Sequence, residues 1–492
     1  MPEFADMKKL ILFFFFHCFL LTVHTAQSQT GPIALHPQNS HYLIYQGKTT
    51  ALITSGEHYG AVLNLDYDYK KYLQTLTDEG MNYTRIFSGT YYELAGDFNI
   101  EKNNLAPKRE RYIGPWPDAE NDKSKFDLSK WNDAYFVRLK DFLTEARKRD
   151  IIVEVTLFSS IYNDKTWGVS PQNPVNNVNF TDSLPYKRAQ TLDNKGLWPY
   201  QEAFVKKIVT ELNDFDNFFF EVQNEPWSDR NVPVYNIMNK EELIKNEWQQ
   251  KADFADEASL NWQDAIANTI TQTEQKLPKK HLIAQNYANY RASIPDVKTN
   301  ISIINFHYAW PEAVQWNYHY DKVIGFDESG FAGSDDAVYR RQAWQFMLSG
   351  GGMFNNLDYS FSVDNEDGKG TYKAPGGGST ALRAQLKTLA DFLNSYSLEK
   401  LYPNYTSTLA APGLITYTLS DKSKAFAVFV RATGTTKSTL KMAADNGTYR
   451  VKSFDPISGK YTSLGDLKSV GGILTIDINI PDGELALQVL KQ

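Results

Sequence analysis

The sequence predicts an α/β fold, a closed (β/α)8 TIM barrel followed by a small C-terminal antiparallel β-sandwich. Eight short apolar segments alternate with amphipathic stretches along most of the 492 residues, which is the order of elements in such a barrel. From Tyr402 onward the pattern changes to short alternating strands separated by turn residues. We therefore expect a signal peptide over residues 1–28, the barrel over residues 29–398 and the sandwich over residues 402–492.

The N-terminal segment has the features of an export signal. Met7-Lys8-Lys9 is a short basic start, Leu10–Val23 is almost entirely apolar, and Ala26-Gln27-Ser28 offers small residues for cleavage. The apolar run is shorter than the ~20 residues that a membrane-spanning helix needs. The only cysteine, Cys18, lies in this run after Phe16-His17, and a lipid anchor would require small residues there. We expect a secreted or periplasmic protein without membrane anchor or disulfides.

The barrel strands are expected where short runs rich in β-branched and aromatic residues occur. These runs are Ala51–Ser55, Tyr83–Ser88, Ile151–Phe158, Phe218–Gln223, His281–Asn286, Ile301–His307, Val323–Asp327 and Met353–Asp358. Between them, stretches such as residues 125–150 and 200–215 repeat apolar positions at the helical period. An open doubly wound sheet is the alternative, but residues 55–60 after the first strand lack the Gly-rich phosphate loop of that fold.

The C-terminal sandwich is expected from five runs of alternating or apolar residues. They are Gly413–Leu419, Ala425–Ala432, Gly447–Pro456, Ile473–Ile480 and Glu484–Leu490. Turn residues at Asp445-Asn446-Gly447 and Ser458-Gly459 separate some of these runs. Such a domain would pack against the barrel, and a role for it in sugar binding is left open.

Polar residues follow the predicted barrel strands, at the end of the barrel where active sites of this fold lie. Glu225 in FFFEVQNEPW follows the fourth strand, and Glu328 in KVIGFDESGF follows the seventh. Two carboxylates at the ends of two strands can face each other across a substrate, which is the minimum needed to break a glycosidic bond. The other polar side chains at strand ends are Glu57, His58, Arg85, Asn224, Asn286, His307, Tyr308 and Asp358. We expect these residues to share one substrate-binding pocket.

Three of these features together resemble a known group of enzymes. Asn224-Glu225-Pro226 on the fourth strand, Glu328 on the seventh and Asn82-x-x-Arg85 on the second resemble the clan A retaining glycoside hydrolases, of which family 5 contains cellulases and mannanases. The resemblance spans most of residues 45–395. It implies double-displacement cleavage of β-glycosidic bonds in a poly- or oligosaccharide, with Glu225 as acid/base and Glu328 as nucleophile. Glu225 is expected to hold the proton that the pair shares.

The resemblance also gives roles to the neighbouring residues. Arg85 would hold Glu328 ionised through a charge-assisted hydrogen bond. Asn224 would donate a hydrogen bond to the 2-hydroxyl of the sugar. His307 and Tyr308 would orient Glu328 and the bound ring.

The chain also departs from the family 5 pattern. That family has His-x-Tyr on the sixth strand, whereas here Tyr308 directly follows His307. The tryptophan of the eighth strand is replaced by the sequence Asn355–Tyr359, and Thr156–Ser159 on the third strand lacks the histidine of the family. These departures leave the substrate open and are consistent with a separate family of the clan.

Aromatic residues make up 14% of the chain, and carbohydrate sites are rich in exposed rings, although most aromatic rings of a globular protein lie in its core. Two or three of the tryptophans in predicted strand-to-helix loops are expected to line sugar subsites, and Trp227 and Trp310 are assigned to the substrate site. The loop tryptophans are Trp116, Trp167, Trp198, Trp227 and Trp310. Trp248, Trp262 and Trp344 occur in helical patterns and are expected in the core.

The net charge of −7 argues against nucleic acid and anionic membranes as partners. We expect a monomer that acts on a carbohydrate and uses no cofactor and no metal. Metal-dependent hydrolysis through His58 and His307 is one alternative, but their spacing has no metal-ligand pattern. An inactive carbohydrate-binding barrel is the other, although binding alone gives no reason for two facing glutamates.

Overall fold

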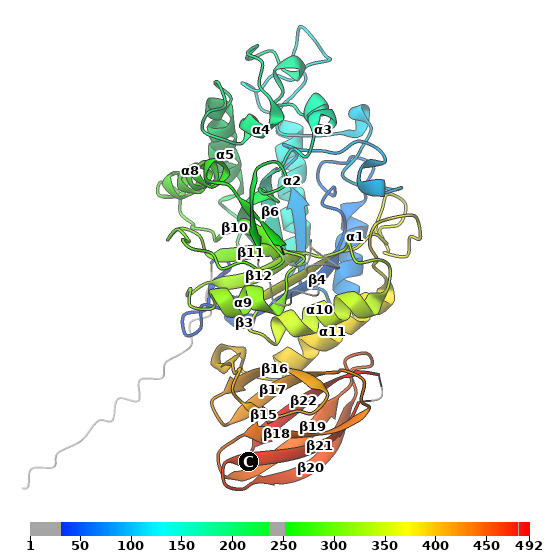
Figure 1. Ribbon diagram of the computed structural model, residues 1–492. Coiled ribbons are helices and arrows are strands. Elements are labelled where there is room, and N and C mark those ends of the chain that lie inside the picture. The colour runs from blue at the N-terminus through cyan, green and yellow to red at the C-terminus, as the bar shows by residue number, and fades with distance from the viewer. Residues whose placement is uncertain (1–30, 236–250, 481) are drawn as a thin grey trace, which may run out of the picture.

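The computed structural model describes residues 31–235, 251–480 and 482–492. The expected signal peptide and Trp248 lie outside these ranges. Parallel strands form a barrel in the order β4-β13-β12-β11-β10-β7-β6-β5, and antiparallel sheets follow at the C-terminus (Figure 1). The barrel strands are β4 (Leu52–Gly56), β5 (Tyr83–Phe87), β6 (Ile152–Ser159), β7 (Phe218–Asn224), β10 (Ile283–Asn289), β11 (Ile303–His307), β12 (Val323–Glu328) and β13 (Met353–Leu357). The predicted (β/α)8 barrel with a C-terminal β-domain is therefore confirmed.

The side chain of Asn82 joins the two ends of this strand order, β4 and β5. Its Oδ1 accepts a hydrogen bond from the backbone N–H of Ile53 at 2.9 Å, and its Nδ2 donates to the carbonyl of Ala51 at 2.9 Å. These are the two kinds of hydrogen bond that a neighbouring strand would supply. The asparagine of the Asn-x-x-Arg pattern therefore helps to close the barrel.

Helices surround the barrel and connect most of its strands in turn (Figure 1). They are α1 (Tyr69–Asp78), α2 (Asp133–Arg147), α3 (Asp164–Val169), α4 (Tyr186–Ala189), α5 (Trp198–Leu212), α8 (Glu257–Glu274), α9 (Pro311–Asn317), α10 (Asp336–Met347) and α11 (Thr380–Asn394). Between β10 and β11 the described chain has no helix, and residues 290–302 connect the strands directly. None of the helices in the described ranges has both the length and the apolar character to cross a membrane.

A small N-terminal sheet closes the bottom of the barrel. Its strands are β1 (Ala34–Leu35), β2 (Leu43–Tyr45) and β3 (Lys48–Thr50). Ile33, Leu43 and Tyr45 pack in one apolar cluster with residues at or near the start of the barrel strands, such as Tyr83 and Phe219. Because this end is filled by apolar side chains, a site inside the barrel must open at the opposite end, where the strands terminate.

A β-hairpin extends the barrel after the fourth barrel strand. It consists of β8 (Asn231–Tyr235) and β9 (Lys251–Ala255), which pair antiparallel. β9 also pairs with β10 through Phe254 and Ala288. This pairing fixes the hairpin at the rim of the C-terminal end of the barrel.

The C-terminal domain is a sandwich of two antiparallel sheets. A six-stranded sheet has the order β14-β16-β17-β22-β19-β20, and a three-stranded sheet has the order β15-β18-β21. The strands are β14 (Tyr402–Pro403), β15 (Thr408–Ala410), β16 (Leu414–Asp421), β17 (Ala425–Ala432), β18 (Lys437–Ala443), β19 (Gly447–Phe454), β20 (Tyr461–Ser469), β21 (Ile473–Asn479) and β22 (Glu484–Lys491). The five predicted runs correspond to β16, β17, β19, β21 and β22. The sequence does not predict β14, β15, β18 and β20. β14 and β15 have only two and three residues, and most residues of β20 are exposed.

In the larger sheet, the central strand β17 is largely buried on both faces, and one of these faces packs on the barrel. In β17, Phe426 and Val428 point into the core of the sandwich, whereas Phe429 belongs to the barrel core. The ring of Phe429 stacks on Trp344 of α10 at a centroid distance of 5.3 Å. Alternating residues of one strand therefore join the two domains.

Candidate active site

Glu225 and Glu328 lie together at the C-terminal end of the barrel. Glu328 is the last residue of β12, and Glu225 directly follows β7. One carboxylate oxygen of each and a ring nitrogen of His307 all lie within 4.8 Å of one another. Both side chains line a cavity of about 400 Å³, which we call the catalytic cavity. Two acids that are far apart in the sequence thus meet at one opening.

Three residues around this pair have left-handed backbone conformations. The φ angles are 45° at Glu225, 54° at Tyr308 and 50° at Tyr59, each shortly after a barrel strand. Such angles cost residues other than glycine on the order of 1–3 kcal/mol and persist where the surroundings enforce them. Here they direct three side chains toward one point, since both tyrosines hydrogen-bond to the glutamates.

Glu225 accepts four hydrogen bonds from side chains. His307 Nδ1 and the hydroxyl of Tyr308 lie 3.0 and 3.1 Å from its Oε1. The hydroxyls of Tyr162 and Ser228 lie 2.8 and 3.1 Å from its Oε2. The carboxylate is held in one orientation, with one edge toward the catalytic cavity.

Glu328 has a different set of partners. Its Oε2 accepts hydrogen bonds from the hydroxyl of Tyr59 at 2.8 Å and from Arg85 Nη1 at 3.2 Å. The hydroxyl of Tyr308 lies 2.8 Å from its Oε1. Arg85 therefore contacts Glu328 as the resemblance to clan A glycoside hydrolases implies, and the hydroxyl of Tyr308 lies within hydrogen-bond distance of both glutamates.

The charges around the pair do not favour the expected protonation of Glu225. Burial alone would lower the pKa of His307, but the charges of Glu328 and Asp327 raise it well above its ordinary value. Burial opposes ionisation of Glu225, yet the hydrogen bond and charge of His307 lower the pKa of Glu225. Burial and the charge of Glu225 raise the pKa of Glu328, although His307 and Arg85 oppose this rise. Without substrate, the shared proton is therefore favoured on Glu328 instead of Glu225, because the imidazolium lies closer to Glu225.

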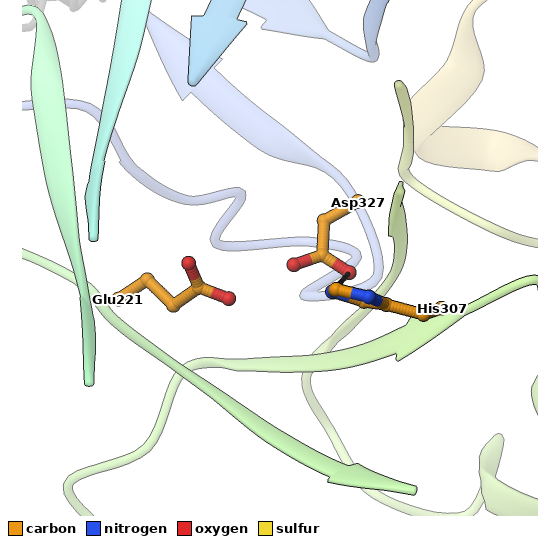
Figure 2. A group of neighbouring side chains, drawn as sticks. All are labelled: Glu221, His307 and Asp327. Atoms are coloured by element: carbon orange, nitrogen blue, oxygen red, sulfur yellow. Dashed lines mark ion pairs between the residues drawn. The ribbon is translucent and has the colours of Figure 1, made fainter. Parts of the chain in front are cut away.

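A layer of buried charges lies directly beneath the pair. Arg85 Nη2 is 2.7 Å from Glu221 Oε2 and 3.6 Å from Asp327 Oδ2, and all three side chains have 0% exposure. Glu221, His307 and Asp327 come from three strands and point toward one another (Figure 2). Burial raises the pKa of Glu221 to about 7, whereas the charges of His307 and Arg85 lower the pKa of Asp327 to about 2 against the effect of burial.

The sequence contains a signal for this layer, which lies inside the strands and not at their ends. Glu154 and Glu221 are charged residues inside otherwise apolar strands, and such residues are rarely buried unless they are paired. Glu154 hydrogen-bonds with Tyr83 and Asn305, and burial raises its pKa well above the ordinary value. The layer fixes Arg85 and His307, which in turn contact the catalytic pair.

Other predicted site residues also line the catalytic cavity. They include His58, Asn224 and Trp227. His58 Nε2 lies 3.1 Å from Glu93, and the indole of Trp227 packs edge-on against His307. The amide of Asn224 donates to Ser159 and Tyr162, so it would have to exchange one of these bonds to reach a sugar hydroxyl.

Three predicted substrate-binding residues occupy other positions, and this corrects the expectation for them. Glu57 accepts hydrogen bonds from the backbone N–H groups of Gly60 and Ala61, and so it stabilises the turn after β4. Asn286 lies in the buried layer, where its amide donates to Glu221. Asp358 pairs with Arg383 of α11 at 2.6 Å. Each of the three side chains bonds to protein groups, and none of them lines the catalytic cavity.

The loop tryptophans divide into different environments. Trp116 and Trp167 are buried at 2% and 5% exposure, and Trp167 donates its indole N–H to the carbonyl of Leu184. Neither of them lines the catalytic cavity. Trp198 begins α5, whereas Trp310 lines a second cavity beyond Tyr308. Trp262 and Trp344 are core residues, as expected.

The rim of the catalytic cavity is formed by the hairpin and by loops, which cannot be identified from the residues at the strand ends. The hairpin supplies Asn231 and Asp253, and loops supply Glu93, Tyr162 and Phe331. These residues lie outside the barrel strands, so their approach to the pair depends on loop shape. The ring of Tyr162 is nevertheless fixed, because its hydroxyl bonds to Glu225 and Asn224.

His307 takes part in two groups of side chains that could surround a cation. The groups are Glu225–His307–Glu328 and Glu221–His307–Asp327. The raised pKa of His307 favours an imidazolium, which offers no lone pair to a metal. Its ring lies between Glu225 and Asp327, with Nδ1 toward the former and Nε2 toward the latter, so the imidazolium itself supplies positive charge to both groups.

Three solved structures with a similar fold are described as glycoside hydrolases. A Bacteroides vulgatus protein provisionally described as a glycoside hydrolase is 12% identical with a TM-score of 0.64, over 95% of this chain and 83% of that chain. A family 5 glycoside hydrolase from the same organism is 10% identical with a TM-score of 0.60, over 94% of each chain. A third glycoside hydrolase is 11% identical with a TM-score of 0.57, over 94% of this chain and 97% of that chain.

The matches cover most of the chain and so include both the barrel and the C-terminal domain. The expected likeness to family 5 structures is confirmed at the level of the fold. No protein-family model matches the sequence, and no curated protein sequence matches it.

Proposed function

We propose that this protein is a retaining glycoside hydrolase that cleaves β-glycosidic bonds of a poly- or oligosaccharide. One observation carries the proposal: Glu225 and Glu328 present carboxylate oxygens within 4.8 Å of each other at the cavity where the barrel strands end. Glycoside hydrolases with the same fold add support.

The separation of the pair favours retention of configuration. Carboxyl groups in retaining enzymes lie about 5–5.5 Å apart, whereas inverting enzymes need roughly 6.5–9.5 Å to admit a water molecule between acid and base. An oxygen of Glu225 and an oxygen of Glu328 lie within 4.8 Å of each other, which fits the shorter separation. One carboxylate therefore attacks the anomeric carbon directly.

In the first half-reaction, Glu328 attacks as a carboxylate and Glu225 gives its proton to the leaving oxygen. The free site favours the proton on Glu328, so it must cross to Glu225 before attack. Tyr308 offers the route, because its hydroxyl lies 2.8 Å from Glu328 and 3.1 Å from Glu225. It can donate its proton to Glu225 while it accepts the proton of Glu328. Arg85 and Tyr59 then stabilise the Glu328 carboxylate by hydrogen bonds.

In the second half-reaction, water attacks the glycosyl ester of Glu328. Esterification removes the negative charge of Glu328, and Glu225, already ionised, is hydrogen-bonded to His307. Glu225 takes a proton from the attacking water, the ester C–O bond breaks, and Glu328 leaves as a carboxylate. The configuration at the anomeric carbon is thereby restored.

A panel of defined β-linked oligosaccharides and 4-nitrophenyl β-glycosides tests the proposal. We expect hydrolysis of at least one member and, by NMR, a first-formed product of β configuration. Glu225→Ala and Glu328→Ala should each lose most activity, whereas Glu202→Gln on the outer helix α5 should leave it unchanged. Azide should rescue Glu225→Ala with a β-glycosyl azide and Glu328→Ala with an α-glycosyl azide. Rescue products of the opposite configurations would exchange the two roles.

Other outcomes would contradict the proposal. Binding of sugars without hydrolysis would make the barrel a carbohydrate-binding protein, the alternative considered from the sequence. Turnover abolished by EDTA would require a metal-dependent mechanism instead of the carboxylate pair.

A further inference from the structure

A second cavity of about 870 Å³ lies between the barrel and the sandwich, and we call it the interdomain cavity. Tyr308 and Phe331 line both this cavity and the catalytic cavity. Their rings contact each other edge to face, with centroids 5.8 Å apart. The two cavities are therefore neighbours, and these two side chains belong to the walls of both.

The walls of the interdomain cavity combine aromatic rings with amides and hydroxyls. Trp310 comes from the loop after β11, and the guanidinium of Arg291 lies 4.2 Å from its ring centroid. Tyr417 of β16 and Arg431 of β17 come from the sandwich. Apolar faces flanked by hydroxyl, amide and charged groups suit a pyranose, which has C–H faces and a rim of hydroxyls.

Two acceptors on the barrel side lack donors. Glu312 Oε2 and Gln342 Oε1 are buried and accept no hydrogen bond from the described residues. Both residues line the interdomain cavity. Buried acceptors without partners cost free energy. Both side chains are only partly buried, so a rotation would present these oxygens to the hydroxyls of a ligand.

Several side-chain contacts join the two domains beside the cavity. Arg340 of α10 forms a buried ion pair with Glu484 of β22, and Trp344 stacks on Phe429. The hydroxyl of Tyr405 also donates to the carbonyl of Ser349 at 3.3 Å. A volume of this size lies in the range of about 300–1,000 Å³ that is typical of small-molecule sites.

We propose that the interdomain cavity binds the part of the saccharide that extends beyond the catalytic cavity, so that the sandwich contributes directly to substrate recognition. The inference rests on the proposed glycosidase function. Its consequence is a preference for long oligosaccharides over disaccharides, because only a long substrate reaches Tyr417 and Arg431.

The test measures kcat/KM for β-linked disaccharides and hexasaccharides of glucose, mannose and xylose, and for 4-nitrophenyl β-glycosides of single sugars. We expect wild type to favour the hexasaccharide of its sugar. Tyr417→Ala should lower the hexasaccharide-to-disaccharide ratio about tenfold, in line with the loss of an aromatic contact. Tyr461→Ala, which removes an exposed tyrosine of β20, is the matched control and should leave the ratio unchanged. Circular dichroism melting curves establish that each variant is folded.

The outcomes separate this inference from the function on which it rests. Hydrolysis with equal kcat/KM for both lengths, or a ratio unaltered by Tyr417→Ala and by Arg431→Ala, overturns the inference alone. Absence of hydrolysis with every substrate overturns the proposed function and the inference with it. A tenfold lower ratio in folded Tyr417→Ala, with Tyr461→Ala unaffected, supports the inference.

Discussion

The hydroxyl of Tyr308 lies 2.8 Å from Oε1 of Glu328. The same hydroxyl lies 3.1 Å from Oε1 of Glu225. A hydroxyl has one proton to donate, so it can donate to only one carboxylate at a time and can accept a proton from the other. Tyr308 therefore couples the protonation of the two glutamates.

Replacement of Tyr308 by phenylalanine should reduce kcat on the order of 10²-fold, the lower range for loss of an acid/base contribution. The proton would then lack its route from Glu328 to Glu225. The pKa of Glu328, already raised by burial, should rise further because a hydrogen bond to its ionised form is lost. Stopped-flow assays of glycosyl-enzyme formation measure the first half-reaction directly.

Tyr59→Phe is the matched control for this variant. Tyr59 also donates to Glu328, at 2.8 Å, but it has no contact with Glu225 in the described hydrogen bonds. It should therefore change the pKa of Glu328 with a smaller loss of kcat. Equal losses in the two phenylalanine variants would argue against proton transfer through Tyr308.

His307→Asn should move the acidic limb of the pH–activity profile to higher pH. Asparagine keeps an N–H group near Glu225 but removes the positive charge that lowers the pKa of Glu225. The pKa of Glu225 then rises. Activity at low pH is lost when both glutamates are protonated, so this loss begins at a higher pH in the variant. The profile of kcat/KM measures the shift, and an acidic limb that stays in place or moves to lower pH would refute the assigned role of His307.

The barrel and its two acids could be predicted because they depend on local sequence patterns. Strands buried on both faces appear as short apolar runs, and residues that end parallel strands share one edge. Glu225 and Glu328 therefore converge whatever the loop conformations are. Arg85 lies in the middle of β5, and the register of β5 and β6 places it beside Glu154 in the barrel.

The rest of the site depends on partners that are distant in the sequence. Asp358 ends the last barrel strand, as expected, but Arg383 of α11 pairs with it. Glu57 follows the first strand, yet the turn at Gly60 brings two N–H groups onto its carboxylate. No pattern within a single strand encodes these contacts. The interdomain cavity likewise depends on how the sandwich packs on α10.

Arg85→Met should destabilise the protein by about 3–5 kcal/mol at neutral pH, the range for breaking a buried ion pair. The variant leaves Glu221 and Asp327 in the barrel without the guanidinium. The loss should be smaller at pH 5, because buried carboxylates without a counter-charge bind protons more readily there. Denaturant unfolding at both pH values measures the difference.

Lys387→Met is the comparison for this experiment. Lys387 pairs with Asp391 on the exposed face of α11, where both side chains are about half exposed. Its removal should change the free energy of unfolding by less than about 1 kcal/mol at either pH. If Arg85→Met had an equally small effect, the buried layer would not depend on its arginine.

Asn82→Ala should cost about 1–3 kcal/mol of stability, because it leaves the backbone N–H of Ile53 and the carbonyl of Ala51 without their hydrogen bonds. Asn82→Asp separates the two contacts. Its carboxylate can still accept from Ile53, but it repels the carbonyl of Ala51 until it is protonated, so stability should recover as the pH falls below about 4.

Asn268→Ala on the exposed face of α8 is the control and should have little effect at any pH. Thermal unfolding between pH 3 and 7 distinguishes the three variants. If Asn82→Asp were as stable as wild type at pH 7, the hydrogen bond to Ala51 would contribute nothing to closing the barrel.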